Sequence, residues 1–353
     1  MTARPDSRGN ASSSAPSGGP WTIRSLLAWI QGHLTERGVE SPRLCAEILV
    51  GHVLGCERLR LYMDSERVPS DAERATLREL VLRAGKHEPV QYLVGTWPFR
   101  GREFELGRST LIPRPATETL VEQAVAWYRQ AMLNQPLRMA DIGTGTGIIA
   151  ISVIAELRSA LRLTGCRPLA GNAPRPTAAV PEIQIGVPAV PIDATEGALP
   201  SLSLRCLATD VEPEAVALAK RNVTRHGLLG AIDVRHGSLF EPFRHSRPNS
   251  FDLITSNPPY VSDAEWAEVE ANVRDYEPES ALRGGRDGLD VIRPLVAGAS
   301  AWLRPGGLLL VEIGYRQGPA AMALVAEKAT WCQSEVIRDF EDHPRVLRAV
   351  RAG

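Results

Sequence analysis

The stretch Met139-Ala140-Asp141-Ile142-Gly143-Thr144-Gly145-Thr146-Gly147, followed by the apolar run 148–151, decides the fold of this chain. An apolar segment ending in an acid, three alternating glycines and a second apolar segment predict a strand, a tight loop and a helix. Such glycines let the backbone approach a ligand closely, and the helix N-terminus adds a favourable dipole. A glycine-rich turn without a ligand has the same composition, so the loop alone leaves both interpretations open.

The spacing of these glycines favours one kind of nucleotide site over another. A dinucleotide-binding loop, Gly-x-Gly-x-x-Gly, would need glycine at position 148, where this chain has Ile148. Gly-x-Gly-x-Gly after an Asp-ended strand instead suits a nucleoside without a pyrophosphate. The next predicted strand, 204–208, leads into Thr209-Asp210. Asp210 is therefore predicted to accept both ribose hydroxyls, with a helix cap or a solvated carboxylate as the alternatives.

The interval between these two motifs is long. About 20 residues usually separate the glycine loop from the acid of a strand–helix–strand unit. Here the excess falls at about 164–200, a stretch with seven prolines and no aromatic residue. We interpret this stretch as a surface insertion that cannot pack a core.

A second motif, Asn257-Pro258-Pro259-Tyr260, follows the apolar run 251–254. Proline pushes the preceding residue into an extended conformation and fixes its own φ, so the motif predicts a stiff loop at a strand end. The side-chain carbonyl of Asn257 and the backbone carbonyl of Pro258 can then hold an –NH₂ group by both hydrogens. The Tyr260 ring offers a flat surface for the planar group that carries it. An ordinary proline turn is the alternative.

The remaining pattern predicts an α/β fold. Strand-like runs at 231–235 and 308–313 alternate with helical stripes, one of which contains Leu289, Ile292, Leu295 and Val296, and 303–307 is predicted to be a turn. This alternation favours a mostly parallel sheet with helices on both faces. In such sheets ligands bind beyond the C-terminal strand ends, where the glycine loop, Asp210 and Asn257 all lie.

Other segments predict the domain organisation. Residues 1–20 are predicted to be a disordered tail, and 21–86 a small helical bundle, in which Ser41 and Ser70 begin two helices. The bundle carries no evident chemistry, so we interpret it as a docking domain for a substrate protein. Residues 87–115, with strand-like runs at 91–94, 99–106 and 110–112, are predicted to be a β-hairpin linker, and 116–353 the second domain.

Composition narrows the function. The 353 residues have a formal net charge of −1, which argues against a stable nucleic-acid complex. Five cysteines without a Cys-x-x-Cys pair argue against a disulfide framework or a zinc site, so we expect no metal and a reducing, cytoplasmic compartment. No apolar run approaches the length of a membrane span. We expect a monomer that binds no membrane.

Together these motifs resemble the release factor glutamine methyltransferase family (PrmC/HemK), which are class I S-adenosylmethionine-dependent methyltransferases. The resemblance extends over nearly the whole chain from Trp21. Besides the glycine loop it rests on Pro89 to Gly95, Ile112-Pro113-Arg114-Pro115 with Thr117-Glu118, Asn257 to Tyr260, Gly284 to Asp290, Glu312-Ile313-Gly314 and Arg345-Val346. The Asn-Pro-Pro-Tyr motif by itself is shared with N-methyltransferases of nucleic-acid bases.

The resemblance implies a Rossmann-like class I methyltransferase fold. It also implies methyl transfer from S-adenosylmethionine to the glutamine amide nitrogen in the Gly-Gly-Gln motif of a peptide chain release factor. Asn257 and Pro258 would be catalytic, and they would bind the substrate together with Pro259 and Tyr260. The residues implied to hold the cofactor are Gly143, Thr144, Gly145, Thr146, Gly147, Asp210, Leu239 and Asn257.

Two positions depart from the family's usual pattern, and three alternatives stay open. Ala116 replaces a usual Glu, and Leu239 stands where an aromatic residue commonly follows the third strand. A glutamine methyltransferase of a ribosomal protein differs after Ile-Pro-Arg. A nucleic-acid base methyltransferase fits poorly with the near-zero charge. A non-catalytic cofactor-binding module fits poorly with the intact Asn257.

Overall fold

The computed structural model describes residues 20–133, 135–163 and 203–353. These residues belong to two compact units, of which one contains the chain up to residue 97 together with 269–277, and the other contains 98–268 together with 278–353. The boundary between the units falls inside the predicted linker. The predicted tail, apart from Pro20, and the predicted insertion lie outside the described residues.

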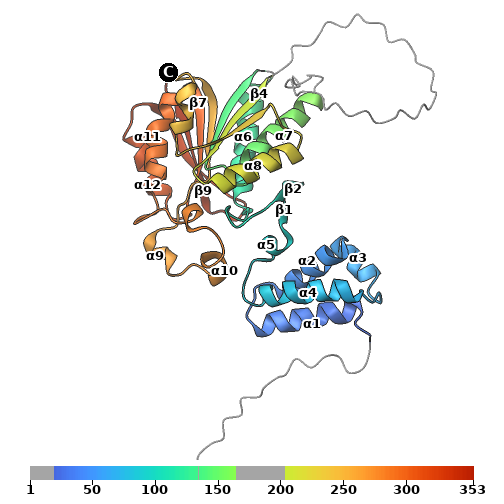
Figure 1. Ribbon diagram of the computed structural model, residues 1–353. Helices are drawn as coiled ribbons and strands as arrows, with labels where there is room; N and C mark the ends of the chain where they lie inside the picture. The colour runs from blue at the N-terminus through green and yellow to red at the C-terminus, as the bar shows by residue number, and fades with distance from the viewer. Residues whose placement is uncertain (1–19, 134, 164–202) are drawn as a thin grey trace, which may run out of the picture. The chain divides into compact units, whose positions relative to one another are not determined.

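The first unit is helical (Figure 1). Its helices are α1 (Ile23–Glu36), α2 (Pro42–Leu54), α3 (Arg58–Met63), α4 (Asp71–Ala84), α5 (Val90–Val94) and the distant α10 (Ala271–Arg274). The predicted capping box of α4 is confirmed, because Ser70 and Glu73 each bond the other's backbone N–H. The predicted start of α2 is also confirmed, because Ser41 is its N-cap residue and Pro42 follows in the first turn, although the Ser41 side chain, at a φ of 47°, makes no capping bond.

Only part of the predicted hairpin linker is extended. Strands β1 (Thr96–Phe99) and β2 (Arg102–Glu105) pair as a two-stranded sheet. The predicted strand at 91–94 is instead part of helix α5, and 110–112 forms no strand. The apolar residues Val90 and Leu93 explain the error, since their three-residue spacing turns both into the helical core. A short apolar run does not by itself distinguish a strand from one helical turn.

The second unit contains a seven-stranded sheet among its described residues (Figure 1). Its strands are β3 (Leu137–Ile142), β4 (Leu204–Asp210), β5 (Ile232–His236), β6 (Phe251–Ser256), β7 (Leu303–Glu312), β8 (Trp331–Arg338) and β9 (Pro344–Arg351). The sheet order is β5-β4-β3-β6-β7-β9-β8. Strands β3 to β7 pair in parallel, and β9 is antiparallel to both of its neighbours. The predicted mostly parallel α/β sheet is therefore confirmed.

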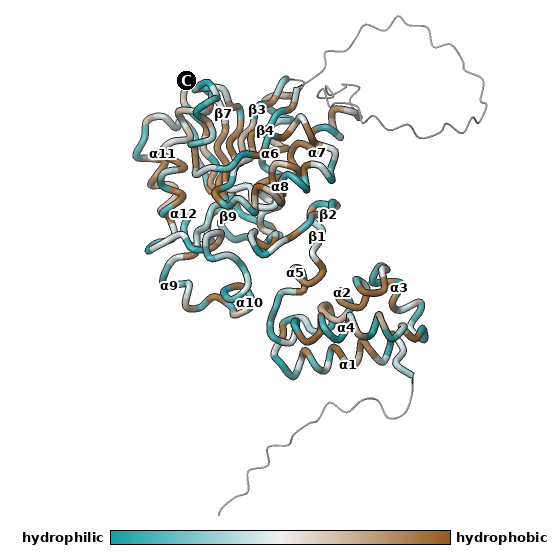
Figure 2. The backbone as a smooth tube through the Cα atoms, in the orientation of Figure 1, coloured by the Kyte–Doolittle hydropathy of each residue, from teal (hydrophilic) through white to brown (hydrophobic). Residues whose placement is uncertain are grey.

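Helices cover both faces of this sheet. The helices of this unit are α6 (Thr117–Ala131), α7 (Ile148–Leu163), α8 (Pro213–Arg225), α9 (Asp263–Trp266), α11 (Ile292–Trp302) and α12 (Gly318–Ala326), with 3-10 helices at Glu241–His245 and Glu279–Ala281. Alternate strand residues separate two apolar cores: Met139 packs with α6, α7 and α8, whereas Ala140 packs with α11 and α12. Brown segments lie in the strands of the sheet in Figure 2, as expected for strands whose apolar residues are buried on both faces.

Two predicted boundaries in this unit are wrong. Leu289 lies before helix α11 rather than within it, and its buried side chain joins the same core as the helix. Residues 303–307 belong to β7 rather than to a free turn, because Leu303 pairs with Phe251 and the register then shifts before Leu308 pairs with Leu253. The bulge explains how Pro305 and two glycines are accommodated in a strand.

The sheet order reverses between β3 and β6. From β3 the chain proceeds outward through β4 and β5, and it then returns to the other side of β3 with β6 and β7. Such a reversal leaves a crevice at the C-terminal strand ends, because the adjoining loops diverge there. No helix among the described residues is long and apolar enough to cross a membrane.

Candidate active site

A cavity of about 250 Å³ opens at this reversal. The loops that follow β3, β4, β5 and β6 all line it, together with the segment 109–117 and residues 290–294. The loop after β3 contains Gly143, Thr144, Gly145, Thr146 and Gly147, and its three glycines have φ values of 69°, 54° and 81°. At Gly147 a side chain would also meet the Cδ1 atom of Ile151 at 3.1 Å, so this position needs glycine for both reasons.

Asp141, in strand β3, anchors the glycine loop through its side chain. Its side chain is fully buried, with hydrogen bonds from the hydroxyls of Thr144 (2.6 Å) and Thr255 (2.7 Å). Burial raises the pKa of the Asp141 carboxyl to about 6, against the opposing effect of these hydrogen bonds and with a smaller contribution from the charge of Asp210. Asp141 therefore connects the end of β3 to Thr144 in the glycine loop and to Thr255 in β6.

Asp210 ends β4 and lines the cavity as predicted. Its Oδ2 accepts the backbone N–H of Gly145 at 2.7 Å, and its Oδ1 accepts that of Glu212 at 3.0 Å. Burial raises the pKa of Asp210, and these backbone hydrogen bonds oppose the rise. Because a carboxylate offers about four acceptor positions, two hydrogen bonds leave capacity for ribose hydroxyls.

Asn222 is a site residue that the sequence did not suggest. It is completely buried in α8, and its Nδ2 donates to the carbonyls of Glu105 (3.0 Å) and Thr146 (2.9 Å). Its Oδ1 accepts the N–H of Glu105 at 2.8 Å. Asn222 therefore ties the glycine loop to strand β2. An Asn inside a helix has a low intrinsic preference for that position, and this was the only local signal.

Leu239 lies in the loop after β5 and lines the cavity. Its φ of 46° is unusual for a residue with a bulky side chain. The loop is held in this conformation by Glu241, whose Oε2 accepts the N–H of Ser238 at 3.1 Å. Backbone strain of this kind is often found where a loop contacts a ligand.

Asn257 follows β6 and lies against the glycine loop. Its backbone carbonyl oxygen is 4.0 Å from the place where a Cβ atom at Gly143 would lie. The Asn257 Nδ2 donates to the Thr117 hydroxyl at 3.3 Å. Asn257 Oδ1 and the Pro258 carbonyl receive no hydrogen bond from the residues that the structure describes. Asn257, Pro258 and Pro259 line the cavity, so two free acceptors stand beside the glycine loop.

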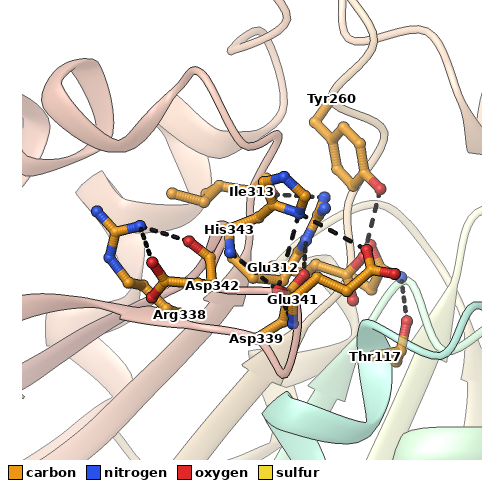
Figure 3. A network of polar contacts seen from close by, with 11 residues as sticks. Thr117, Tyr260, Glu312, Ile313, Arg338, Asp339, Glu341, Asp342 and His343 are labelled. Carbon is orange, nitrogen blue, oxygen red and sulfur yellow. Dashed lines mark hydrogen bonds and ion pairs between the residues drawn. The ribbon is translucent and has the colours of Figure 1, made fainter.

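Tyr260 occupies a different position from these three residues. It is not among the residues that line the cavity, and its hydroxyl donates to Oε1 of Glu312 at 3.3 Å (Figure 3). Burial raises the pKa of Tyr260, and the negative charge of Glu312 adds to the rise. The geometry anchors the ring at its hydroxyl, and the packing of the ring face on a substrate amide stays a prediction.

Known proteins were compared with this chain. The PrmC N-terminal domain family matches residues 25–95. The release factor glutamine methyltransferases of Geobacter sulfurreducens and Deinococcus radiodurans are each 35% identical to it, over 93% and 94% of this chain and 96% and 99% of their own lengths. That of Rhodopirellula baltica is 30% identical, over 94% of this chain and 97% of its own length.

The chain belongs to the release factor glutamine methyltransferase family. This membership indicates that the cavity is the methyltransferase site, because the glycine loop, Asp210 and Asn257 all line it. Ala116, where the family usually has Glu, occupies the N-cap position of α6 and makes no side-chain capping bond. The departure therefore removes a polar group from the helix end, and Ala116 itself is not among the residues that line the cavity.

Gln317 joins the loops of this methyltransferase outside the cavity. Its Nε2 donates to the carbonyls of Tyr260 (2.9 Å) and Gly288 (3.2 Å), and its Oε1 accepts the N–H of Gly314 at 2.8 Å. One side chain thus connects the Asn-Pro-Pro-Tyr loop, the Gly284–Asp290 loop and the end of β7. Gly288 must be glycine, because a Cβ atom there would overlap both Gln317 and the carbonyl of Tyr260.

Proposed function

We propose that this protein transfers a methyl group from S-adenosylmethionine to the side-chain amide nitrogen of the glutamine in the Gly-Gly-Gln motif of a peptide chain release factor. The family to which the chain belongs supports this reaction. The observation that carries it to particular residues is the pair of free acceptors, Asn257 Oδ1 and the Pro258 carbonyl, on the same cavity as the glycine loop.

The residues around the cavity fit this cofactor. Glycines at 143, 145 and 147 allow close approach of a ligand, and Asp210 has free acceptor positions for ribose hydroxyls. Leu239 offers an apolar side chain for a purine ring. The pKa values of Asp141 and Asp210 are both raised by burial, so a cationic ligand would offset the energy of holding these charges away from water.

When bound, S-adenosylmethionine supplies an electrophilic methyl group on a sulfonium sulfur. The residues of this chain have to deliver a weak nucleophile, because the lone pair of an amide nitrogen is delocalised into its carbonyl. Asn257 Oδ1 and the Pro258 carbonyl accept the two N–H bonds of the glutamine amide. This contact would orient the nitrogen and favour a pyramidal geometry. As the bond from nitrogen to the methyl carbon formed, the bond from that carbon to the sulfonium sulfur would break and leave a neutral thioether, and one of the two amide protons would pass to water. The contribution is orientation and preorganised electrostatics, with no strong base required.

We also propose that the helical unit docks the release factor. The short helix α3 exposes Leu59 and Met63, with 70% and 68% of their surfaces accessible, one turn apart on one side of the helix. Tyr62 beside them is 48% exposed. Exposed apolar residues grouped in this way are typical of a surface that binds another protein.

Methyl transfer can be tested with S-adenosylmethionine labelled in its methyl group. The protein is incubated separately with a purified release factor, the same factor with Gly-Gly-Gln changed to Gly-Gly-Ala, a ribosomal-protein mixture, and DNA. We expect label only in the unaltered release factor. Label in ribosomal protein or in DNA, with none in the release factor, would refute the proposed substrate.

The division of roles within the site is tested by Asn257→Ala. Removal of one preorganised acceptor is expected to lower kcat by about a hundredfold or more. Cofactor affinity, measured by calorimetry, should stay within about threefold of the wild type, because the glycine loop and Asp210 remain. Parallel loss of cofactor binding would show that Asn257 is not specific to the substrate amide.

A further inference from the structure

Thr117 lies at the first position of helix α6 and lines the cavity beside Asn257. Only 2% of its surface is exposed, and its hydroxyl oxygen accepts the hydrogen bond from Asn257 Nδ2 at 3.3 Å. A buried Thr at a helix start would commonly cap the helix, but the N-cap residue of α6 is Ala116 and no side chain caps this end. The Thr117 hydroxyl therefore serves a different purpose.

Glu312 stands behind Thr117 at the end of β7. It has no exposed surface, and it receives the Tyr260 hydroxyl at Oε1 (Figure 3). Burial raises the pKa of Glu312, while a hydrogen bond from Thr117, the charges of Arg345 and Arg114, and the Tyr260 hydroxyl all act in the opposite direction. Its Oε2 has no partner of good hydrogen-bond geometry within the described part of the chain. Within the described part of the chain, Glu312 therefore has an acceptor atom, Oε2, that no hydrogen bond uses.

The direction of each hydrogen bond follows from the groups involved. When Glu312 is ionised it can only accept, and its Oε2 has no hydrogen-bond partner among the described residues, so the single hydroxyl hydrogen of Thr117 is free to point toward it. The lone pairs of Thr117 then face Asn257, and only Nδ2 of that amide can donate to them. If the Asn257 amide were rotated by half a turn, its Oδ1 would face the hydroxyl oxygen of Thr117. Two acceptors would then lie opposite each other with no hydrogen between them. One orientation is therefore favoured, and it leaves Oδ1 free.

We propose that Thr117 is a positioning residue that, supported by Glu312, locks the Asn257 amide with Oδ1 available to the substrate. This inference rests on the proposed function, because it assigns Oδ1 to the glutamine –NH₂ group. In the opposite orientation the Asn257 Nδ2 would present two donors to a group that itself donates. Substrate binding would then lose one of its two contacts and gain a repulsive one.

The test is steady-state kinetics of Thr117→Val with a purified release factor. Valine keeps the volume and removes the hydroxyl, so the amide loses its preferred orientation. We expect kcat to fall at least about tenfold, equivalent to about 1.4 kcal/mol in the barrier, with cofactor affinity unchanged. Thr117→Ser restores the hydroxyl and should recover most of the activity. Thr119→Val, a buried Thr one half-turn further along α6, is the matched control and should behave as the wild type.

A double-mutant cycle with Glu312→Gln tests the proposed series of contacts from Asn257 through Thr117 to Glu312, which we call the relay. A glutamine amide can donate to Thr117, which would turn the Thr117 hydrogen toward Asn257, so the single variant should also lose activity. Since Thr117→Val already breaks the relay, adding Glu312→Gln should lower kcat by less than about twofold more. If the valine variant unfolds early in a thermal melt, Glu312→Gln alone, which leaves the Thr117 side chain in place, still tests the relay.

The outcomes separate the two proposals. If the wild type methylates the release factor and Asn257→Ala is inactive, but Thr117→Val retains kcat within about twofold, the positioning role is refuted and the function stands. Equal losses in the valine and serine variants, or fully additive losses in the cycle, also refute it. A wild type that does not methylate the release factor refutes the proposed function instead.

Discussion

Asp141→Asn should make the protein more stable at neutral pH. The Asp141 carboxyl is fully buried, and burial raises its pKa from an ordinary 3.8 to about 6. A shift of about two pKa units corresponds to about 3 kcal/mol of difference between the two protonation states. Asparagine is neutral: its Oδ1 can accept one of the two threonine hydroxyls and its Nδ2 can donate to the oxygen of the other, so it removes this penalty with little change of shape.

The sign and the pH range follow from the raised pKa. Above about pH 6 the folded protein holds a buried charge that the unfolded chain holds in water, so the full penalty applies. Between about pH 6 and pH 4 the folded protein takes up a proton before the unfolded chain does, and the penalty disappears. We expect the variant to be more stable by up to about 3 kcal/mol at about pH 8, and by about half of that at about pH 5.

The assay is urea unfolding of wild type and variant at these two pH values. Because groups far from Asp141 titrate alike in both proteins, the difference between them reports on Asp141 together with its coupling to Asp210. Asp233→Asn, at a side chain that is 58% exposed, controls for the change of charge. A variant that is less stable than the wild type at about pH 8, or a difference that does not shrink on acidification, would contradict a raised pKa at Asp141.

Two further predictions concern the loops and the helical unit. Gln317→Leu removes the four hydrogen bonds by which this side chain joins the site loops, so we expect kcat to fall and KM for the release factor to rise, with cofactor affinity nearly unchanged. Gln333→Leu, at an exposed position of strand β8, is the control, and equal effects of the two substitutions would contradict a joining role. The double variant Leu59→Ser/Met63→Ser should raise KM for intact release factor but not for a short Gly-Gly-Gln peptide, and a rise for both would contradict docking on α3.

The fold of the methyltransferase unit was largely predictable from the sequence, because strands buried on both faces are continuous apolar runs that end at recognisable loops. Errors arose where short elements depend on tertiary contacts. Residues 91–94 have strand-like composition, but burial of Val90 and Leu93 in the helical core makes them a helix. The start of β7 contains Pro305 and two glycines, and only its pairing across a bulge makes it a strand.

The site was predictable where a motif lies directly at a strand end, as with Asp210 and Asn257. Residues that act through another residue were not predictable in this way. Thr117 was visible within the Pro-x-Thr-Glu stretch, but its contact with Asn257 spans 140 positions in sequence. Tyr260 is a similar case: its place in the motif predicts a substrate contact, but the hydrogen bond of its hydroxyl to Glu312 could not be foreseen from the sequence.

The arrangement around Gln317 has an evolutionary consequence. Three loops that are far apart in the sequence meet at a single amide, which uses its donor and its acceptor at the same time. Glutamate lacks the donor, leucine lacks both groups, and asparagine is shorter by one methylene. A substitution that moves one of these loops is therefore tolerated only when the other two loops change with it. We expect the three loops to diverge together between relatives, as one inherited block, while the exposed helices around them drift freely.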